Sequence, residues 1–228
     1  IVGYENINID LIFNIPDQSI SRWKKDIQSS IELNSEHITL YSLTLEEGTP
    51  MQHQVEKGNI EFLRDGTDVY MYEWAVKYIS NQGYNHYELS SFAQPKKECK
   101  HNLHYWKREP YIGFGPSAHQ YDGKTRSWNV KSLTTYVQQL SKNLLPIENE
   151  ESLTKNDYFN ELLFNGLRLR EGIDIKELEK KYPGNDFNYY IKNYLKKWSD
   201  LKMISGVLHL NSNDIILADT IASDMFYQ

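Results

Sequence analysis

The order of apolar segments in the N-terminal part of the chain constrains the fold more than any other feature of the sequence. Residues 6–15 are β-branched and almost continuously apolar, which is typical of a strand covered on both faces. The runs at 37–45 and 87–92 predict two further strands, and apolar residues at helical spacing predict helices over 20–31 and 69–79. Strands that alternate with helices favour a parallel sheet, either open or curled into part of a barrel.

The pattern changes after the third predicted strand. Residues 93–129 lose helical periodicity and are rich in Gly, Pro, His, Trp and Tyr, which predicts a long functional loop. A helix is expected over 133–140, and the polar and acidic residues 146–152 are the best candidate for a linker. We therefore expect a first domain at 1–148, which contains the ligand loop, and a second domain at 149–228.

The second domain has the pattern of a small mixed unit. Amphipathic periodicity predicts helices over 158–167, 175–182 and 191–201. Two short strands are expected at 207–210 and 215–217, joined by a polar turn. Three helices followed by a hairpin predict a winged-helix-like α+β domain.

Composition narrows the possible functions. The chain of 228 residues carries 25 Lys and Arg against 31 Asp and Glu, so its net charge of −6 argues against binding nucleic acid through bulk electrostatics. Residues 151–228 contain ten basic and twelve acidic side chains, so the Lys-rich segment 192–202 is interpreted as a solvated face. No apolar run approaches the ~20 residues that span a bilayer.

Cys99 is the only cysteine, which excludes an internal disulfide and favours a reducing, cytoplasmic setting. A four-iron cluster needs several thiolates, so this chain is not expected to hold one alone. The sequence starts at Ile1 with neither an initiator Met nor a signal segment, and it reads as a chain cut inside something longer.

Several spaced motifs carry a family resemblance. Residues 10–18 (DLIFNIPDQ) and 36–44 (EHITLYSLT) come first, and 87–119 contains YELSSFAQP, CKHNLHYW and YIGFGPSAH. A further stretch, GLRLREG, lies at 166–172. Together they resemble the oxygen-independent coproporphyrinogen III oxidase family of radical S-adenosylmethionine proteins. The sequence departs from the family pattern at Asn14 and Lys96, where glycine is usual.

The resemblance implies a fold and a first group of site residues. The expected fold class is α/β, the C-terminal half of a partial (β/α) barrel followed by the small α+β domain. In this family the positions of Asp10 and Thr44 lie against S-adenosylmethionine, and Gln18, Gly113 and Gly115 are candidates for the same side. From the residues alone, the 10–18 segment remains either a ligand loop or an ordinary strand end. The family's cluster-binding cysteine loop is absent here, so we expect no catalytic residue and no turnover by this chain alone.

The His-Asn-x-x-Tyr-Trp element at 101–106 resembles the haem-chaperone branch of the family. It implies His101 as an axial ligand to haem iron, Tyr105 and Trp106 as flat area for the porphyrin, and Asn102 as the residue that orients the imidazole. In the alternative reading these side chains only tie the loop to the barrel.

Other residues of this region compete with His101 for the haem iron. His104 and His119 are rival imidazole ligands, and the Cys99 thiolate is a further alternative.

The resemblance therefore implies haem or porphyrin binding and delivery to a haem-accepting protein. A genuine oxidase, and a winged-helix regulatory or interaction module, are the alternatives. An exposed edge of a truncated sheet would also favour self-association.

Overall fold

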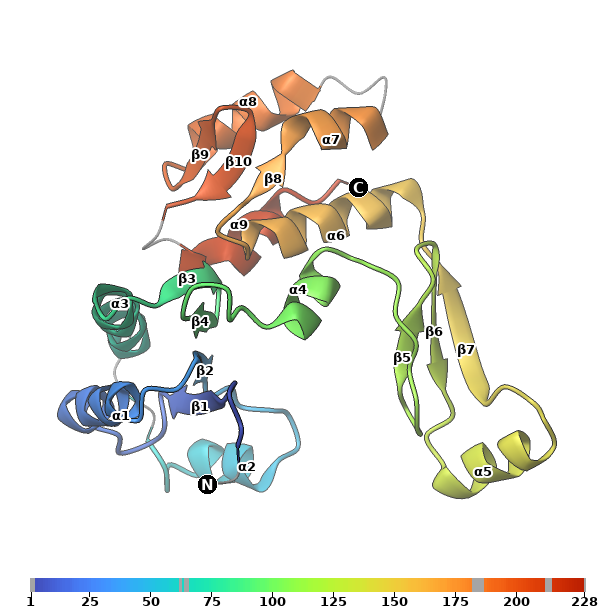
Figure 1. Ribbon diagram of the computed structural model, residues 1–228, viewed down its shortest axis with the longest axis horizontal. Coiled ribbons are helices and arrows are strands. Elements are labelled where there is room, and N and C mark those ends of the chain that lie inside the picture. The colour runs from blue at the N-terminus through green and yellow to red at the C-terminus, as the bar shows by residue number, and fades with distance from the viewer. Residues whose placement is uncertain (1–2, 62, 64–65, 182–186, 212–214, 228) are drawn as a thin grey trace. The chain divides into compact units, whose positions relative to one another are not determined.

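The computed structural model describes residues 3–61, 63, 66–181, 187–211 and 215–227 (Figure 1). The chain forms two compact units. The first is Ile1–Cys99 with Asn211–Ile216, and the second is Lys100–Leu210 with Leu217–Gln228. The main boundary between these units, at Cys99 and Lys100, differs from the boundary expected between domains 1–148 and 149–228, which stays a prediction. The two units are described separately.

The first unit is a four-stranded sheet with helices on one face. In chain order its elements are β1 (Asn8–Phe13), α1 (Ile20–Glu32), β2 (His37–Ser42), α2 (Pro50–Glu56), α3 (Thr67–Asn81), β3 (Asn85–Glu88) and β4 (Ser91–Ala93). The strand order is β1-β2-β4-β3, so β1 and β3 are the edges.

The predicted parallel pair β1–β2 and both long helices are confirmed. The prediction of one strand over 87–92 is wrong, because β3 and β4 form a hairpin here and β4 pairs antiparallel with β2. The polar turn is the physical reason, since the Glu88 carboxylate accepts a hydrogen bond from the Ser90 amide and reverses the chain. The short helix α2 was not predicted.

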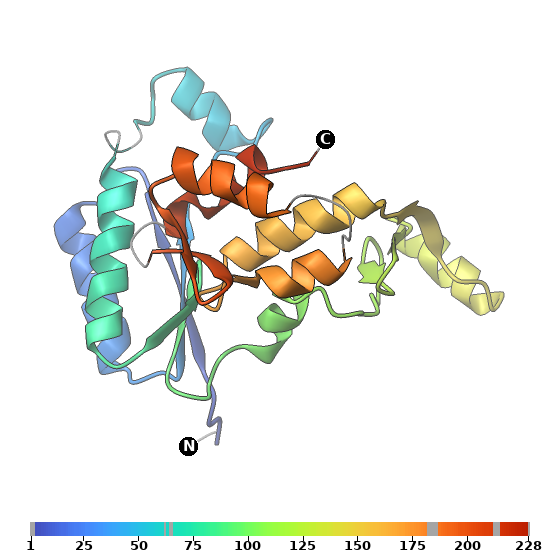
Figure 2. The ribbon, with the colours of Figure 1, turned by 90° about the horizontal axis from the view of Figure 1, so that it is seen from above.

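Helices α1 and α3 lie side by side and pack on one face of this sheet (Figure 2). Ser19 caps α1 by accepting a hydrogen bond from the Arg22 amide. Trp23 is buried between the two helices, and its Nε1 donates to the Met71 carbonyl at 2.9 Å. Because strand side chains alternate between faces, the residues between the core positions point to the opposite face of the sheet.

The second unit begins with α4 (Lys100–Trp106) and a three-stranded antiparallel sheet, β5-β6-β7. These strands are β5 (His119–Tyr121), β6 (Thr125–Asn129) and β7 (Ile147–Ser152), with α5 (Leu133–Ser141) between β6 and β7. The predicted helix 133–140 is confirmed.

Two predictions for this region are wrong. Residues 93–129 are not irregular throughout, because they contain α4, β5 and β6. Residues 146–152 are not a linker, because β7 pairs along β6 from Ser152 to Ile147. The acidic sequence of β7 concealed this strand, since most of its side chains are exposed and form no apolar pattern.

The rest of the second unit is a small α+β domain. Its elements are α6 (Lys155–Leu167), β8 (Ile173–Asp174), α7 (Ile175–Lys181), α8 (Phe187–Lys197), β9 (Leu201–Ile204), β10 (Val207–Leu210) and α9 (Ala218–Asp224). The 3₁₀ helix η1 (Ile215–Leu217) precedes α9 in the chain, and its first two residues belong to the first unit. The strand order is β8-β10-β9, and all pairs are antiparallel.

The three predicted helices and a hairpin are present, whereas α9 was not predicted and the expected pairing of 207–210 with 215–217 is wrong. The partner of β10 is β9, and 215–217 is helical. Ser205 and Gly206 both have positive φ, of 52° and 83°, which is the backbone of a tight hairpin turn. The third helix therefore ends at Lys197 instead of continuing to residue 201.

Candidate functional site

The predicted site residues belong to different units. Asp10, Gln18 and Thr44 lie in the first unit, and the 101–106 element lies in the second with Gly113 and Gly115.

Asp10 lies on the face of the first sheet that is opposite to the helices. Its side chain is exposed, and its Oδ1 accepts a hydrogen bond from Asn8 Nδ2 at 2.6 Å. On the neighbouring strand, His37 and Thr39 stand beside Asn8 and Asp10 in the parallel register. An exposed carboxylate held by a neighbour is a suitable acceptor for a ligand hydroxyl or amino group.

Sequence reasoning missed the partners of Asp10. His37 is buried, and its two ring nitrogens contact Asn8 Oδ1 at 2.6 Å and the Tyr87 hydroxyl at 2.8 Å. Burial lowers the pKa of His37 below its ordinary 6.5, although the charges of Asp10 and Glu98 act in the opposite direction. Burial also raises the pKa of Tyr87 to about 12. A signal was present, since Asn8 and Asp10 alternate with apolar residues within the strand.

Gln18 and Thr44 fit a ligand less well. Gln18 is only 7% exposed, and its amide donates to the Ile12 carbonyl at 3.3 Å and accepts from the Ile15 amide at 3.4 Å. Its polar atoms therefore close the turn after β1. Thr44 is exposed, and its hydroxyl donates to the Ser42 carbonyl at 3.5 Å.

In the second unit, α4 presents His101 with an aromatic neighbour. The exposed imidazole meets the Tyr105 ring edge-on, with centroids 4.9 Å apart and planes at 89°. This is the contact expected for residues four apart on a helix. Tyr105 in turn meets Tyr111 at 4.7 Å, so a row of rings leads away from the histidine. Among the described residues, none lies within hydrogen-bond distance of the His101 imidazole.

The structure separates His101 from His104, one of its competitors. His104 uses both ring nitrogens, because Nε2 lies 2.9 Å from the Pro110 carbonyl and Nδ1 lies 2.5 Å from the Glu109 carboxylate. His119 stacks on Trp128 with centroids 5.5 Å apart. His101 and His119 are both exposed, and neither imidazole has a hydrogen-bond partner among the described residues, so accessibility sets His104 apart from these two.

Asn102 and Trp106 do not share the His101 face. Adjacent helix residues point in different directions, and no hydrogen bond joins Asn102 to His101 in the described part of the chain. Trp106 lies five positions along the helix, and its ring packs against the Arg168 guanidinium at 5.1 Å. The expected roles of Asn102 in orienting the imidazole and of Trp106 in covering the porphyrin thus lack support from this geometry.

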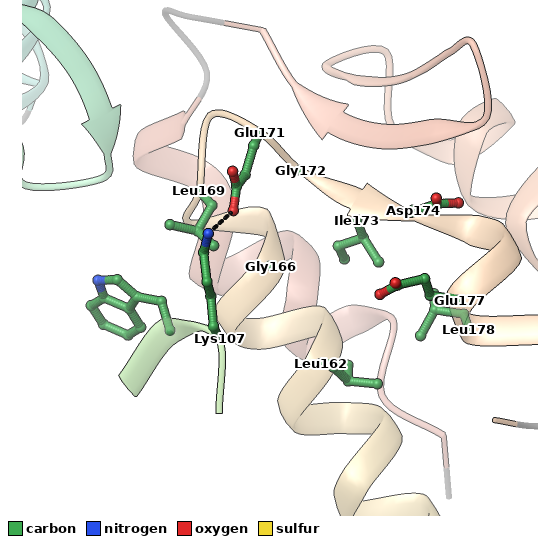
Figure 3. Close-up of a pocket in the computed structure, with 11 residues that line it drawn as sticks. Lys107, Leu162, Gly166, Leu169, Glu171, Gly172, Ile173, Asp174, Glu177 and Leu178 are labelled. Atoms are coloured by element: carbon green, nitrogen blue, oxygen red, sulfur yellow. Dashed lines mark ion pairs between the residues drawn. The ribbon is translucent and has the colours of Figure 1, made fainter. Parts of the chain in front are cut away.

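Trp106 instead borders a hollow of ≈ 330 Å³ beside the end of α6 (Figure 3). Its apolar lining includes Leu162 and Leu178, and the Lys107 ammonium bonds the Glu171 carboxylate at 3.0 Å along its edge. Gly166, which also lines the hollow, has no room for a side chain because a Cβ there would collide with Ile173. The 166–172 motif therefore supports the packing of this domain.

Gly113 and Gly115 have different constraints. A Cβ on Gly113 would collide with the His119 carbonyl, so this glycine is needed for packing within the loop. Gly115 has a φ of 101° and open space around it. Asn129 Nδ2 donates to both glycine carbonyls, at 3.2 and 2.9 Å, which fixes the loop.

The donor set does not fit an iron–sulfur cluster. Within the described ranges, no group of three or more His, Cys, Asp or Glu side chains could hold a metal ion, and Cys99 is the only cysteine of the sequence. Across the same residues, no helix is long and apolar enough to cross a membrane.

Comparisons with known proteins agree with the motifs. The HemN C-terminal domain family matches residues 153–204. The chain is 31% identical to the heme chaperone HemW of Bacillus subtilis, over 95% of this chain and 56% of that protein. It is 36% identical to heme chaperone HemW of Lactococcus lactis, over 79% of this chain and 47% of that protein.

Among solved structures, it resembles coproporphyrinogen III oxidase (HemN) from Escherichia coli, described as a radical SAM enzyme. The TM-score is 0.76 at 16% identity, with 99% of this chain and 56% of that chain covered, which establishes the shared fold. The chain spans about half the length of the relatives it matches.

Proposed function

Because the chain belongs to the HemN/HemW-like family of radical S-adenosylmethionine proteins and corresponds to its C-terminal portion, we propose that it binds haem for delivery to other proteins. The observation that carries this proposal is the exposed His101 imidazole, which has no described hydrogen-bond partner and stands against Tyr105. Neutral imidazole is a common axial ligand of haem iron, so this nitrogen is the candidate ligand.

Tyr105 supports the ligand in two ways. Its edge contact restricts rotation of the imidazole, and its partly exposed ring offers apolar area for one porphyrin edge. A ligand on the surface of a short helix leaves the opposite face of the haem open. That open face is where a haem-accepting protein would provide its own ligand.

The family implies two further groups, S-adenosylmethionine and a four-iron cluster. Asp10 fits the first, since its exposed carboxylate is held by Asn8 and can accept hydrogen bonds. S-adenosylmethionine supplies the radical chemistry of the family when a cluster reduces it. The described residues do not fit a cluster, and we propose that this chain alone turns over no substrate.

The test is a haem titration of the purified chain, followed by the Soret band. We expect His101→Ala to shift the band and weaken binding roughly tenfold or more, the loss of about 1.4 kcal/mol. His104→Ala is the matched control, because the His104 nitrogens are already engaged. Equal spectra and affinities for His101→Ala and the unmodified chain would contradict the assignment.

The oxidase alternative is tested on the full-length protein, with coproporphyrinogen under anaerobic conditions. Tight haem binding without decarboxylation supports the chaperone role. Robust decarboxylation would overturn it.

A further inference from the structure

The polar face of the first sheet holds a row of hydrogen bonds whose direction is fixed by chemistry. It starts at Asp10, whose carboxylate only accepts, so Asn8 must turn its Nδ2 toward Asp10 Oδ1, at 2.6 Å. The Asn8 oxygen then faces the second strand. There it lies 2.6 Å from His37 Nδ1 and accepts from the Thr39 hydroxyl at 3.1 Å.

The orientation of Asn8 determines the tautomer of His37. Since Asn8 Oδ1 is an acceptor, His37 Nδ1 carries the proton, and in the neutral ring Nε2 is an acceptor. The Tyr87 hydroxyl therefore donates to His37 Nε2 across 2.8 Å. The Tyr87 oxygen accepts in turn from the Cys99 amide at 3.3 Å.

The row is buried at its His37 end and exposed to solvent at its Asp10 end. His37 and Thr39 are 5% and 3% exposed, so water does not compete for their bonds. Asp10 is exposed, and within the described chain nothing bonds its second oxygen. A preorganised acceptor of this kind binds a ligand donor without first losing the freedom of its own side chain.

We propose that Asn8, His37 and Tyr87 are positioning residues, which hold the Asp10 carboxylate ready for a donor group of S-adenosylmethionine. This inference deepens the proposed function and rests on its assignment of Asp10. Tyr87 acts through His37 and Asn8, lies three hydrogen bonds from Asp10, and has no need to touch the ligand.

The decisive variant is Tyr87→Phe, which removes one hydroxyl and keeps the ring. Tyr78→Phe is the matched control, since Tyr78 stacks on Trp74 and lies outside the row. Long-range proton–nitrogen NMR on the ligand-free chain reports the His37 tautomer. We expect the Nδ1–H form in the unmodified chain, in Tyr78→Phe and in Tyr87→Phe, because Asn8 still accepts from Nδ1 in all three, and a mixture of tautomers in Asn8→Ala.

Equilibrium dialysis with S-adenosylmethionine gives the second readout. We expect a three- to tenfold weaker affinity, roughly the loss of one hydrogen bond, for Tyr87→Phe and for Asn8→Ala, with Tyr78→Phe unchanged. An unaltered melting temperature separates this effect from general destabilisation.

The two readouts distinguish two failures. An Nε2–H tautomer in the unmodified chain overturns the row, whatever the ligand does. Unchanged affinity in both variants, with normal binding by the unmodified chain, overturns the positioning role. If the unmodified chain fails to bind S-adenosylmethionine, the assignment of Asp10 and the positioning role fall together. The haem titration remains independent of all these results.

Discussion

Arg108 lies two residues after the end of α4 and fixes the helix that carries His101. Its side chain is 3% exposed, and its Nε lies 2.9 Å from the Glu161 carboxylate. The remaining nitrogens donate to the Tyr158 carbonyl at 3.0 Å and to the Tyr121 hydroxyl at 2.9 Å. The guanidinium also stacks on the Tyr158 ring at 3.7 Å. We predict that Arg108→Met strongly destabilises the second unit.

The size of the effect follows from these contacts. Removing one partner of a buried ion pair costs about 3–5 kcal/mol, because the other charge stays buried without compensation. Glu161 is 23% exposed and keeps Arg126 at 2.8 Å, so we expect the lower end of this range. About 3 kcal/mol corresponds to a fall in melting temperature of roughly 6–12 °C for a chain of this size.

The assay is thermal and urea unfolding followed by circular dichroism. Lys107→Ala is the matched control, since its ion pair with Glu171 is 43% and 60% exposed, and such pairs contribute about 0–1 kcal/mol. If Arg108→Met lowered stability by no more than Lys107→Ala does, the buried network would not anchor α4 and the reasoning would be refuted.

Three further predictions concern single positions. Lys96 has a φ of 68°, which is costly for a side chain, so Lys96→Gly should stabilise the chain by about 1 kcal/mol, and an unchanged or lower melting temperature would contradict this. Gly113→Ala should cost about 1–3 kcal/mol in urea unfolding because its Cβ meets the His119 carbonyl, and a neutral result would show that the loop yields. The pKa of His37 is lowered from 6.5 by burial, so the unfolded chain takes up a proton first as the pH falls. The free energy of unfolding should therefore decrease below pH 6.5 until the folded pKa is reached, and His37→Asn should remove that part of the pH dependence in urea titrations.

The local pattern of apolar residues was enough to predict the helices and strands that are amphipathic or buried on both faces. The β1–β2 pair, α1, α3 and α5 follow from apolar spacing and a capping serine, which act within a few residues. The family motifs also contained backbone information. Asn14 and Lys96, where glycine is usual, have φ of 62° and 68°, so the glycine of the pattern meets a conformational need.

Pairing between distant segments was beyond the sequence. The strand at 147–152 exists because β6 supplies its hydrogen bonds. The β9–β10 hairpin is local instead, and the expected pairing with 215–217 overlooked its positive-φ turn at Ser205 and Gly206. Strand pairing depends on partners far along the chain, and exposed edge strands leave little trace in composition.

The candidate site also has features that the sequence predicted and features that only the structure showed. The sequence alone determined which residue types are present, including Asp10 and the 101–106 element with its histidines. Only the tertiary structure decided that His104 is engaged while His101 is accessible, and that a row beginning at Asn8 holds Asp10 in place. The physical reason is that residue identity is a local property, whereas accessibility, orientation and tautomer depend on neighbours that folding brings together.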